Sequence, residues 1–174
     1  MSMRVVHYVN QFFGGIGGED RANVGVSLTT EAVGASRALQ QALGTQGTVV
    51  GTLIGGDNYV NEQQKEAEAA LAAHLQALHP DLVLAGPAFN AGRYTLACAQ
   101  VCLVAQKLGI PAVTGMHPDS PGAISHRPHI FIVPTAATSA DMPQALASMI
   151  RLGLKLARQE PLGPAEVEGY LPRG

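Results

Sequence analysis

Tryptophan is missing from this chain of 174 residues, cysteine occurs only twice, and Asp, Glu, Lys and Arg together make up just 14% of it. Two cysteines are too few for the disulfide framework of a small secreted domain. The net charge is −2, and Lys and Arg form no cluster. Nucleic acid is therefore not expected as a partner, because phosphate binding needs concentrated positive charge.

Long apolar runs are absent too. No stretch reaches the roughly 20 apolar residues that a membrane helix needs. The segment Met1–Tyr8 lacks the apolar core and the small-residue cleavage site of a signal peptide. We therefore predict a soluble, cytoplasmic protein. Hydrophobic residues make up 47% of the chain, and globular domains usually carry about 25% charged residues. So little charge predicts that another chain covers part of the surface, as in an oligomer.

Short runs rich in Val and Ile alternate with segments of helical periodicity, which predicts βαβ units and a mainly parallel sheet. The predicted strands are Val5–Val9, Val49–Ile54, Leu82–Ala85, Ala112–Thr114 and Ile130–Val133, and the predicted helices are Val33–Leu43, Asn61–Leu78, Arg93–Leu108 and Asp141–Gln159. The fold class expected is α/β, a three-layer, doubly wound, five-stranded sheet of flavodoxin or Rossmann type. Residues 1–160 are predicted to form one domain, and residues 161–174, rich in Pro and Gly, an extended arm lying on a partner or on the domain's own surface.

In open α/β sheets, ligands bind at the carboxyl ends of the strands, so the loops there are the candidate sites. The loop Asn10–Asp20 contains four glycines, and its exposed amides could cradle an anion. The alternative is a loop or lid in which Phe12 and Phe13 pack into the core or onto a partner. The predicted helix Asn61–Leu78 is expected to begin at Asn61 as its N-cap.

Two further loops carry polar side chains. Asp57, Asn58 and Tyr59 follow the second predicted strand, where they could bind a substrate amine or simply form a turn and cap a helix. Asn90 and Arg93 follow the third. Arg93 opens a helix, where its charge opposes the helix dipole, so we expect an anionic partner for it. That partner is either a ligand carboxylate or an acidic side chain of this or another subunit.

The groups that could react directly are few. Cys98 and Cys102 lie four residues apart on one helix among apolar neighbours, which favours buried, inert thiols over a redox pair. His117 is a candidate for a proton donor, the alternative being a hydrogen bond within its loop. The spacing of the histidines matches no zinc pattern, so no metal site is predicted. Any reactive group is expected to come from a cofactor or another chain.

Several motifs of these loops, in order, resemble one known family. They are Arg4–Phe13, Gly14–Glu19, Gly56–Tyr59, Gly86–Tyr94, Ala97–Cys98, Leu108–Met116 and Glu168–Gly174, and they resemble the N-terminal part of the selenoprotein B subunit of glycine, sarcosine and betaine reductases, to which the D-proline reductase selenoprotein is related. The resemblance implies reductive cleavage of a C–N or related C–heteroatom bond in a small amine or amino-acid-like substrate. It also implies that the attacking selenocysteine or cysteine lies in a part of the family's sequence that is absent here. No cofactor is then expected in this chain, because a partner would supply the thiol or selenol.

On this basis the predicted role is the substrate-binding half of a shared site. The residues expected to bind substrate are Asn10, Gly17, Gly18, Glu19, Asp57, Asn58, Tyr59, Asn90, Arg93 and Tyr94. Two other functions stay open at this point. One is a non-catalytic binding or scaffold subunit, and the other is a flavodoxin-like protein that binds a nucleotide or flavin near Gly14–Gly18.

Overall fold

The computed structural model describes residues 2–173, which form a six-stranded sheet with helices on both faces. In chain order the elements are β1 (Met3–Asn10), η1 (Glu19–Arg21), β2 (Ser27–Thr29), α1 (Ala35–Leu43), β3 (Gly47–Gly55), α2 (Asp57–Glu62), α3 (Gln64–Leu78), β4 (Leu82–Phe89), α4 (Gly92–Lys107), β5 (Ala112–Met116), α5 (Pro121–His126), β6 (Phe131–Pro134), η2 (Ser139–Asp141), α6 (Met142–Ala157) and α7 (Ala165–Glu168). The predicted doubly wound α/β fold is confirmed, with one strand more than expected.

The strand order is β2-β3-β1-β4-β5-β6, and every pairing except β2 with β3 is parallel. Strand β2 is the element that the sequence did not predict. It is an antiparallel edge strand of three residues. The other five strands follow the flavodoxin order. Their fully buried Val, Ile and Leu residues explain why short apolar runs revealed them.

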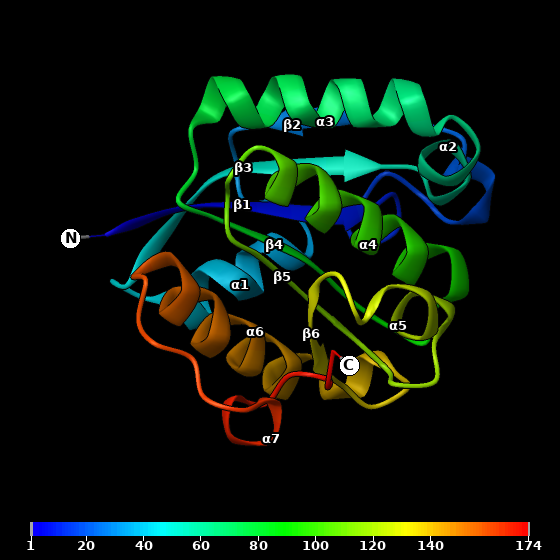
Figure 1. Cartoon of the computed structure of the whole chain (residues 1–174). Coiled ribbons are helices and arrows are strands. Elements are labelled where there is room, and N and C mark those ends of the chain that lie inside the picture. The colour runs from blue at the N-terminus through cyan, green and yellow to red at the C-terminus, as the bar shows by residue number, and fades with distance from the viewer. Residues whose placement is uncertain (1, 174) are drawn as a thin grey trace.

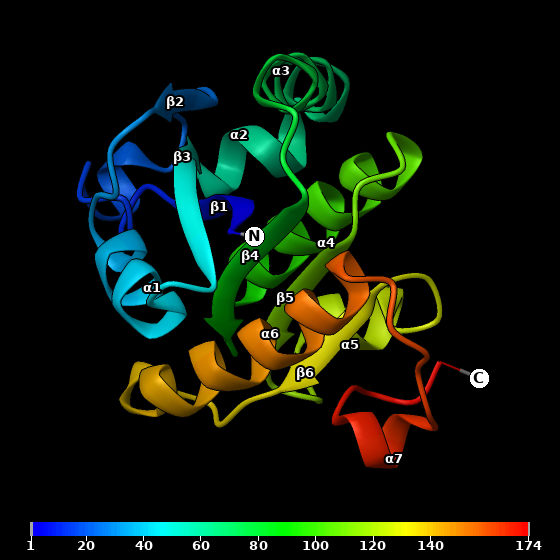
Figure 2. The same ribbon diagram turned by 90° about the vertical axis from the view of Figure 1, so that its left-hand side faces the viewer.

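Two apolar clusters separate the sheet from its helices. One contains Tyr8, Leu71 and Val101 and lies under α3 and α4, and the other contains Leu39, Leu84 and Met149 and lies under α1 and α6. Figure 2 shows the sheet between these two helix layers. In Figure 1 the carboxyl ends of the strands lie to the right, beside the short helices α2 and α5.

The second predicted helix begins later than expected. Asn61 is not an N-cap, because it lies inside α2, and α3 begins only at Gln64. The break falls at Gln63, whose backbone (φ −113°, ψ 55°) is not helical. Asn61 instead donates hydrogen bonds from Nδ2 to the carbonyl oxygens of Asp57 (2.7 Å) and Arg93 (2.9 Å). It therefore ties α2 to the start of α4.

The C-terminal segment packs on the domain's own surface, and within the predicted extended arm Ala165–Glu168 form the short helix α7. The Glu168 carboxylate is almost completely buried and accepts hydrogen bonds from Lys155 Nζ at 2.8 and 2.9 Å. The Leu171 amide donates to the Ile132 carbonyl of β6 at 2.8 Å. A paired, hydrogen-bonded carboxylate is the form in which a buried charge is tolerated, so this contact holds the segment in place.

Candidate functional site

The sheet places its switch point at β1. After β1 the chain continues to β3 on one side and then crosses to β4 on the other. The connections leave in opposite directions here, which opens a crevice at the carboxyl ends of β1 and β4. The register pairs Asn10 with Gly55, two residues before Asp57. Asn10 and Asp57, which lie far apart in the sequence, are therefore brought together.

Asn10 and Asp57 are joined by a buried hydrogen bond. Asn10 Nδ2 donates to Asp57 Oδ2 at 3.0 Å, while Asn10 Oδ1 accepts from the Phe13 amide at 2.9 Å. Gln11, whose side chain is also buried, accepts from the Asp57 amide through Oε1 at 3.1 Å. Gln11 was not predicted as a site residue. Its role depends on a contact across 46 positions of sequence, for which the local pattern gives no signal.

The second oxygen of Asp57 is buried and, among the described residues, has no hydrogen-bond partner. Burial raises the pKa of the Asp57 carboxyl, and the hydrogen bond from Asn10 and the charge of Arg93 partly oppose that shift. Buried polar atoms without partners are rare in folded proteins and often mark functional positions. Asp57 is thus the least satisfied charged group of this cluster.

Arg93 lies at the start of α4 with about half of its side chain exposed. Its Nη2 is 2.8 Å from Glu19 Oε2, and its Nη1 donates to Asn58 Oδ1. The anionic partner seen is therefore an acidic side chain of the same chain, one of the two alternatives that the sequence left open. Glu19 is three-quarters exposed, so a ligand carboxylate could take its place without burying an unpaired charge.

Of the remaining predicted site residues, some lie close to the cluster of Asn10, Asp57 and Arg93 and others lie away from it. Tyr94 is buried beneath the loop after β1, where its ring stacks on Phe13 with centroids 5.8 Å apart. Tyr59 turns toward α3 and its hydroxyl donates to Glu66 at 3.4 Å, which does not bring it to the cluster. Asn90 is exposed beyond the end of β4. His117 Nδ1 accepts from the Asp119 amide at 3.1 Å, which is a hydrogen bond within its loop.

The glycine-rich loop uses its amides internally. The amides of Gly14, Gly15, Ile16 and Gly17 donate to carbonyl oxygens of Asn10, Phe12 and Gln11 at 2.9–3.2 Å. An anion bound by these amides would have to displace those hydrogen bonds. The geometry favours the alternative, in which the loop Asn10–Asp20 is a folded cover over the core and Phe13 packs against Tyr94 and Phe89. Gly17 and Gly18 lead this cover into η1, which carries Glu19.

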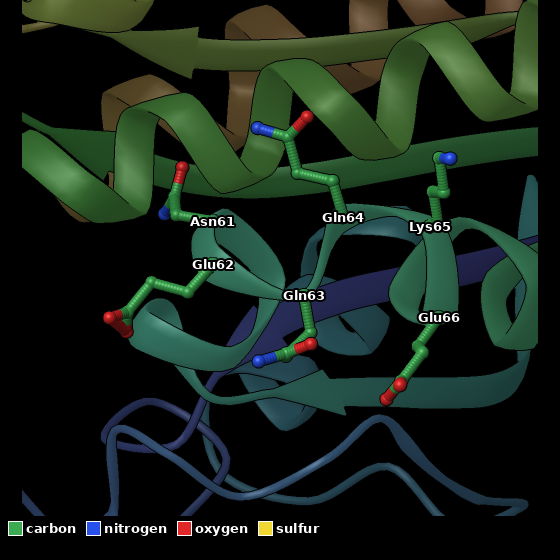
Figure 3. Close-up of a pocket in the computed structure, with 6 residues that line it drawn as sticks. All are labelled: Asn61, Glu62, Gln63, Gln64, Lys65 and Glu66. Carbon is green, nitrogen blue, oxygen red and sulfur yellow. The ribbon is translucent and has the colours of Figure 1, made fainter.

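A pocket of about 450 Å³ adjoins the cluster of Asn10, Asp57 and Arg93. Figure 3 shows the residues that line it. It is lined by six consecutive residues at the junction of α2 and α3: Asn61, Glu62, Gln63, Gln64, Lys65 and Glu66. All except Asn61 are exposed, and their side chains point in different directions. Asn61 alone joins the hollow to the cluster, through its bonds to Asp57 and Arg93. Convergent polar groups indicate a binding site better than volume does, so Asn10, Asp57 and Arg93 form the candidate site.

Both thiols are buried within α4. Burial raises the pKa of Cys98 well above its usual value and that of Cys102 to about 12. Thiolates are the reactive form of cysteine, so neither residue is poised to attack a substrate, in agreement with the sequence-based interpretation. Within residues 2–173, moreover, no three side chains of His, Cys, Asp or Glu come close enough together to hold a metal ion.

The burial of the thiols gives a direct prediction. At pH 8, iodoacetamide should alkylate Cys98 and Cys102 of the folded protein at least about a hundredfold more slowly than it alkylates the unfolded chain, because the thiolate is scarce and covered. Mass spectrometry of the intact protein would follow the reaction. The same chain in guanidinium chloride should take up two labels quickly, and rapid labelling of the folded chain would contradict the buried positions.

Comparison with known proteins decides the family. A family model described as glycine/sarcosine/betaine reductase selenoprotein B matches residues 2–174. The chain belongs to this family. The chain is 46% identical to the glycine reductase complex component B subunit gamma of Carboxydothermus hydrogenoformans over 98% of its length, and it covers 40% of that protein.

Two further relatives match over almost the same length of this chain. The sarcosine reductase complex component B subunit beta of Peptoclostridium acidaminophilum is 43% identical over 97% of this chain and 39% of its own length. The betaine reductase complex component B subunit beta of the same organism is 36% identical over 98% of this chain and 39% of its own length. This chain therefore spans about 40% of the relatives it matches. No solved structure matches. Within the described residues no helix has both the length and the apolar character to cross a bilayer.

Proposed function

We propose that this domain forms the substrate-binding half of a reductase active centre whose attacking cysteine or selenocysteine lies outside residues 1–174. The observation that carries the proposal is the position of Arg93. Its guanidinium is half exposed at the switch point of the sheet, anchored by Asn58 and flanked by the buried pair of Asn10 and Asp57. The family relationship to subunits of glycine, sarcosine and betaine reductase complexes supports it.

The proposed chemistry divides between the two halves. Arg93 would bind the carboxylate of a small amino-acid-like substrate in place of Glu19, with two parallel N–H···O bonds. The polar groups of Asn58 and Asp57 would face the nitrogen. A thiolate or selenolate from the other half would then attack the substrate carbon, and the nitrogen would leave with the electron pair of the C–N bond. The buried thiols of this domain take no part in that step.

The test is the turnover of the assembled reductase with Arg93→Ala. We expect kcat/KM to fall by more than about tenfold, because one lost charge-assisted contact is worth roughly 1.5–3 kcal/mol. Arg93→Lys should recover only part of the rate, since an ammonium group keeps the charge but lacks the planar fork.

Arg158→Ala is the matched control, because Arg158 is exposed at the end of α6 and makes no contact with the cluster. Its turnover should stay within a factor of two. Normal turnover in a folded Arg93→Ala variant would remove Arg93 from the site and, with it, the basis of the proposal.

A further inference from the structure

Two of the exposed large hydrophobic side chains lie in one loop beside the site. Among the described residues, Phe12 is 63% exposed, Ile16 39%, Ile124 68% and Val167 68%. Phe12 and Ile16 are four positions apart in the cover that follows β1, between Asn10 and Glu19. Single exposed apolar residues need no explanation, but an aromatic and a branched side chain only four positions apart, in one loop at the rim of a polar site, do. We call them the Phe12–Ile16 patch.

The loop holds this patch outward in a fixed conformation. Four successive amides, from Gly14 to Gly17, donate within the loop. The Phe12 ring meets the edge of Phe13 at 5.1 Å and 87°, and Phe13 in turn stacks on the buried ring of Tyr94. A surface that is already ordered loses little conformational entropy when a partner binds. Phe12 therefore has the properties of a preformed anchor for another protein surface.

The charges around the patch are already paired. Glu19 is bound to Arg93 at 2.8 Å, and Asp20 lies 3.9 Å from Arg21. A partner would gain little from them by electrostatic attraction. The association should thus depend mainly on buried apolar area and respond weakly to salt.

The length of the relatives indicates the occupant. This chain corresponds to about 40% of each relative that it matches, so more than half of such a subunit lies outside the matched region and is a candidate to cover an exposed apolar surface of this domain. We propose that the Phe12–Ile16 patch is the docking surface for that remaining portion of the reductase, the portion that carries the reactive cysteine or selenocysteine. This inference rests on the proposed function, because docking there brings the attacking group to Arg93 and Asp57.

A photocrosslinker identifies the occupant directly. Phe12→p-benzoyl-phenylalanine is introduced into this chain, which is co-expressed with the polypeptide corresponding to the rest of the family's subunit, and the purified complex is irradiated. Mass spectrometry should find Phe12 linked to that polypeptide. The same residue placed at Val167, on α7, should give no such link. A link to a second copy of this chain, or none to the co-expressed polypeptide, would overturn the proposal.

A binding measurement gives the size of the effect. Phe12→Ser should weaken the association by at least about tenfold, the loss typical of an aromatic anchor, whereas Val167→Ser should leave it within a factor of two. Raising the NaCl concentration from about 0.05 to 0.5 M should change the affinity by less than about threefold. Equal affinity of Phe12→Ser and the parent chain would refute docking at this patch.

The two proposals fail separately. If Phe12→Ser assembles normally while Arg93→Ala loses turnover, the docking surface is wrong and the substrate site stands. If Phe12→Ser blocks assembly while Arg93→Ala turns over normally, the reverse holds.

Discussion

Replacing Gly56 by alanine is expected to lower the free energy of unfolding by about 3–5 kcal/mol. Gly56 sits directly before α2, and a Cβ built on it would lie 2.4 Å from the Ala22 carbonyl oxygen and 2.6 Å from that of Val24. Both contacts are with backbone, which cannot turn aside as a flexible side chain can. One of the two backbone segments, Ala22–Val24 or the start of α2, would therefore have to move.

The cost is large because the same carbonyl groups hold α2. The Ala22 oxygen accepts from the amides of Asn58 (2.8 Å) and Tyr59 (3.2 Å), and the Val24 oxygen accepts from Gly56 itself (3.0 Å). Moving the two segments apart would break or stretch all three hydrogen bonds, each worth about 1 kcal/mol, in addition to the steric strain. Asp57 and Asn58 would shift with the helix, so substrate turnover should fall as well.

Gly92→Ala is the matched control at the start of the neighbouring helix α4. A Cβ there meets nothing within 4 Å, and alanine favours the helix by up to about 1 kcal/mol over glycine. Urea unfolding monitored by circular dichroism would compare the two variants with the parent chain. A Gly56→Ala protein as stable as Gly92→Ala would show that the approach of Ala22 and Val24 to α2 is looser than described.

Acid should destabilise this domain by about 3 kcal/mol between pH 7 and pH 4 through one buried imidazole, that of His7. His7 is completely buried in β1, and burial lowers its pKa from 6.5 to about 4. Its Nε2 lies 2.6 Å from the Gly86 carbonyl oxygen, which can only accept, so the proton resides on Nε2. Nδ1 then accepts from the Ser36 hydroxyl at 2.7 Å. Each nitrogen of the neutral imidazole therefore has a hydrogen-bond partner.

The direction in which stability changes with pH follows from which state binds the proton. Between pH 6.5 and about 4 the unfolded chain binds a proton at His7 and the folded chain does not, so the free energy of unfolding falls as the pH falls through this range. The loss is complete below about pH 4. Because burial raises the pKa of Asp57, that carboxyl shifts the balance the other way, and a variant is needed to isolate the histidine.

Denaturant titrations of the parent chain and His7→Gln at several pH values between 4.5 and 7 provide that comparison. The variant should be less stable at pH 7, because it disturbs the contacts to Gly86 and Ser36. Its stability should nevertheless depend less steeply on pH, by close to one proton. Equal slopes for both proteins would mean that His7 takes up its proton in the folded state.

Most of the sheet follows from local pattern, and the misses have identifiable causes. The five parallel strands are mostly buried, so each contains a short run of apolar residues that stands out in the sequence. Strand β2 has only three residues, Ser27–Thr29, half-buried or exposed at the edge, too few for any period to emerge. The misplaced helix start at Asn61 comes from the short helix α2 ending directly before α3, which leaves no spacer between the two patterns.

The candidate site, too, could be predicted from the sequence only in part. The switch-point rule brought Asn10, Asp57 and Arg93 to one place because it depends only on the direction of the strands. Gln11 and the bond between Glu19 and Arg93 could not be derived, since each joins segments that meet only after the sheet has assembled. Tyr59 was assigned by its neighbourhood in sequence, yet the helical turn beginning at Asp57 directs it toward Glu66.

The burial of Cys98 and Cys102 has a practical consequence for labelling experiments on the assembled reductase. A mild chalcogen-specific reagent added to the native assembly would meet no competing group in this domain, since both sulfur atoms lie out of reach inside α4. The label would then count only the nucleophiles supplied from elsewhere. If the attacking group lies in another part of the reductase, as proposed, it could therefore be titrated without first replacing Cys98 or Cys102.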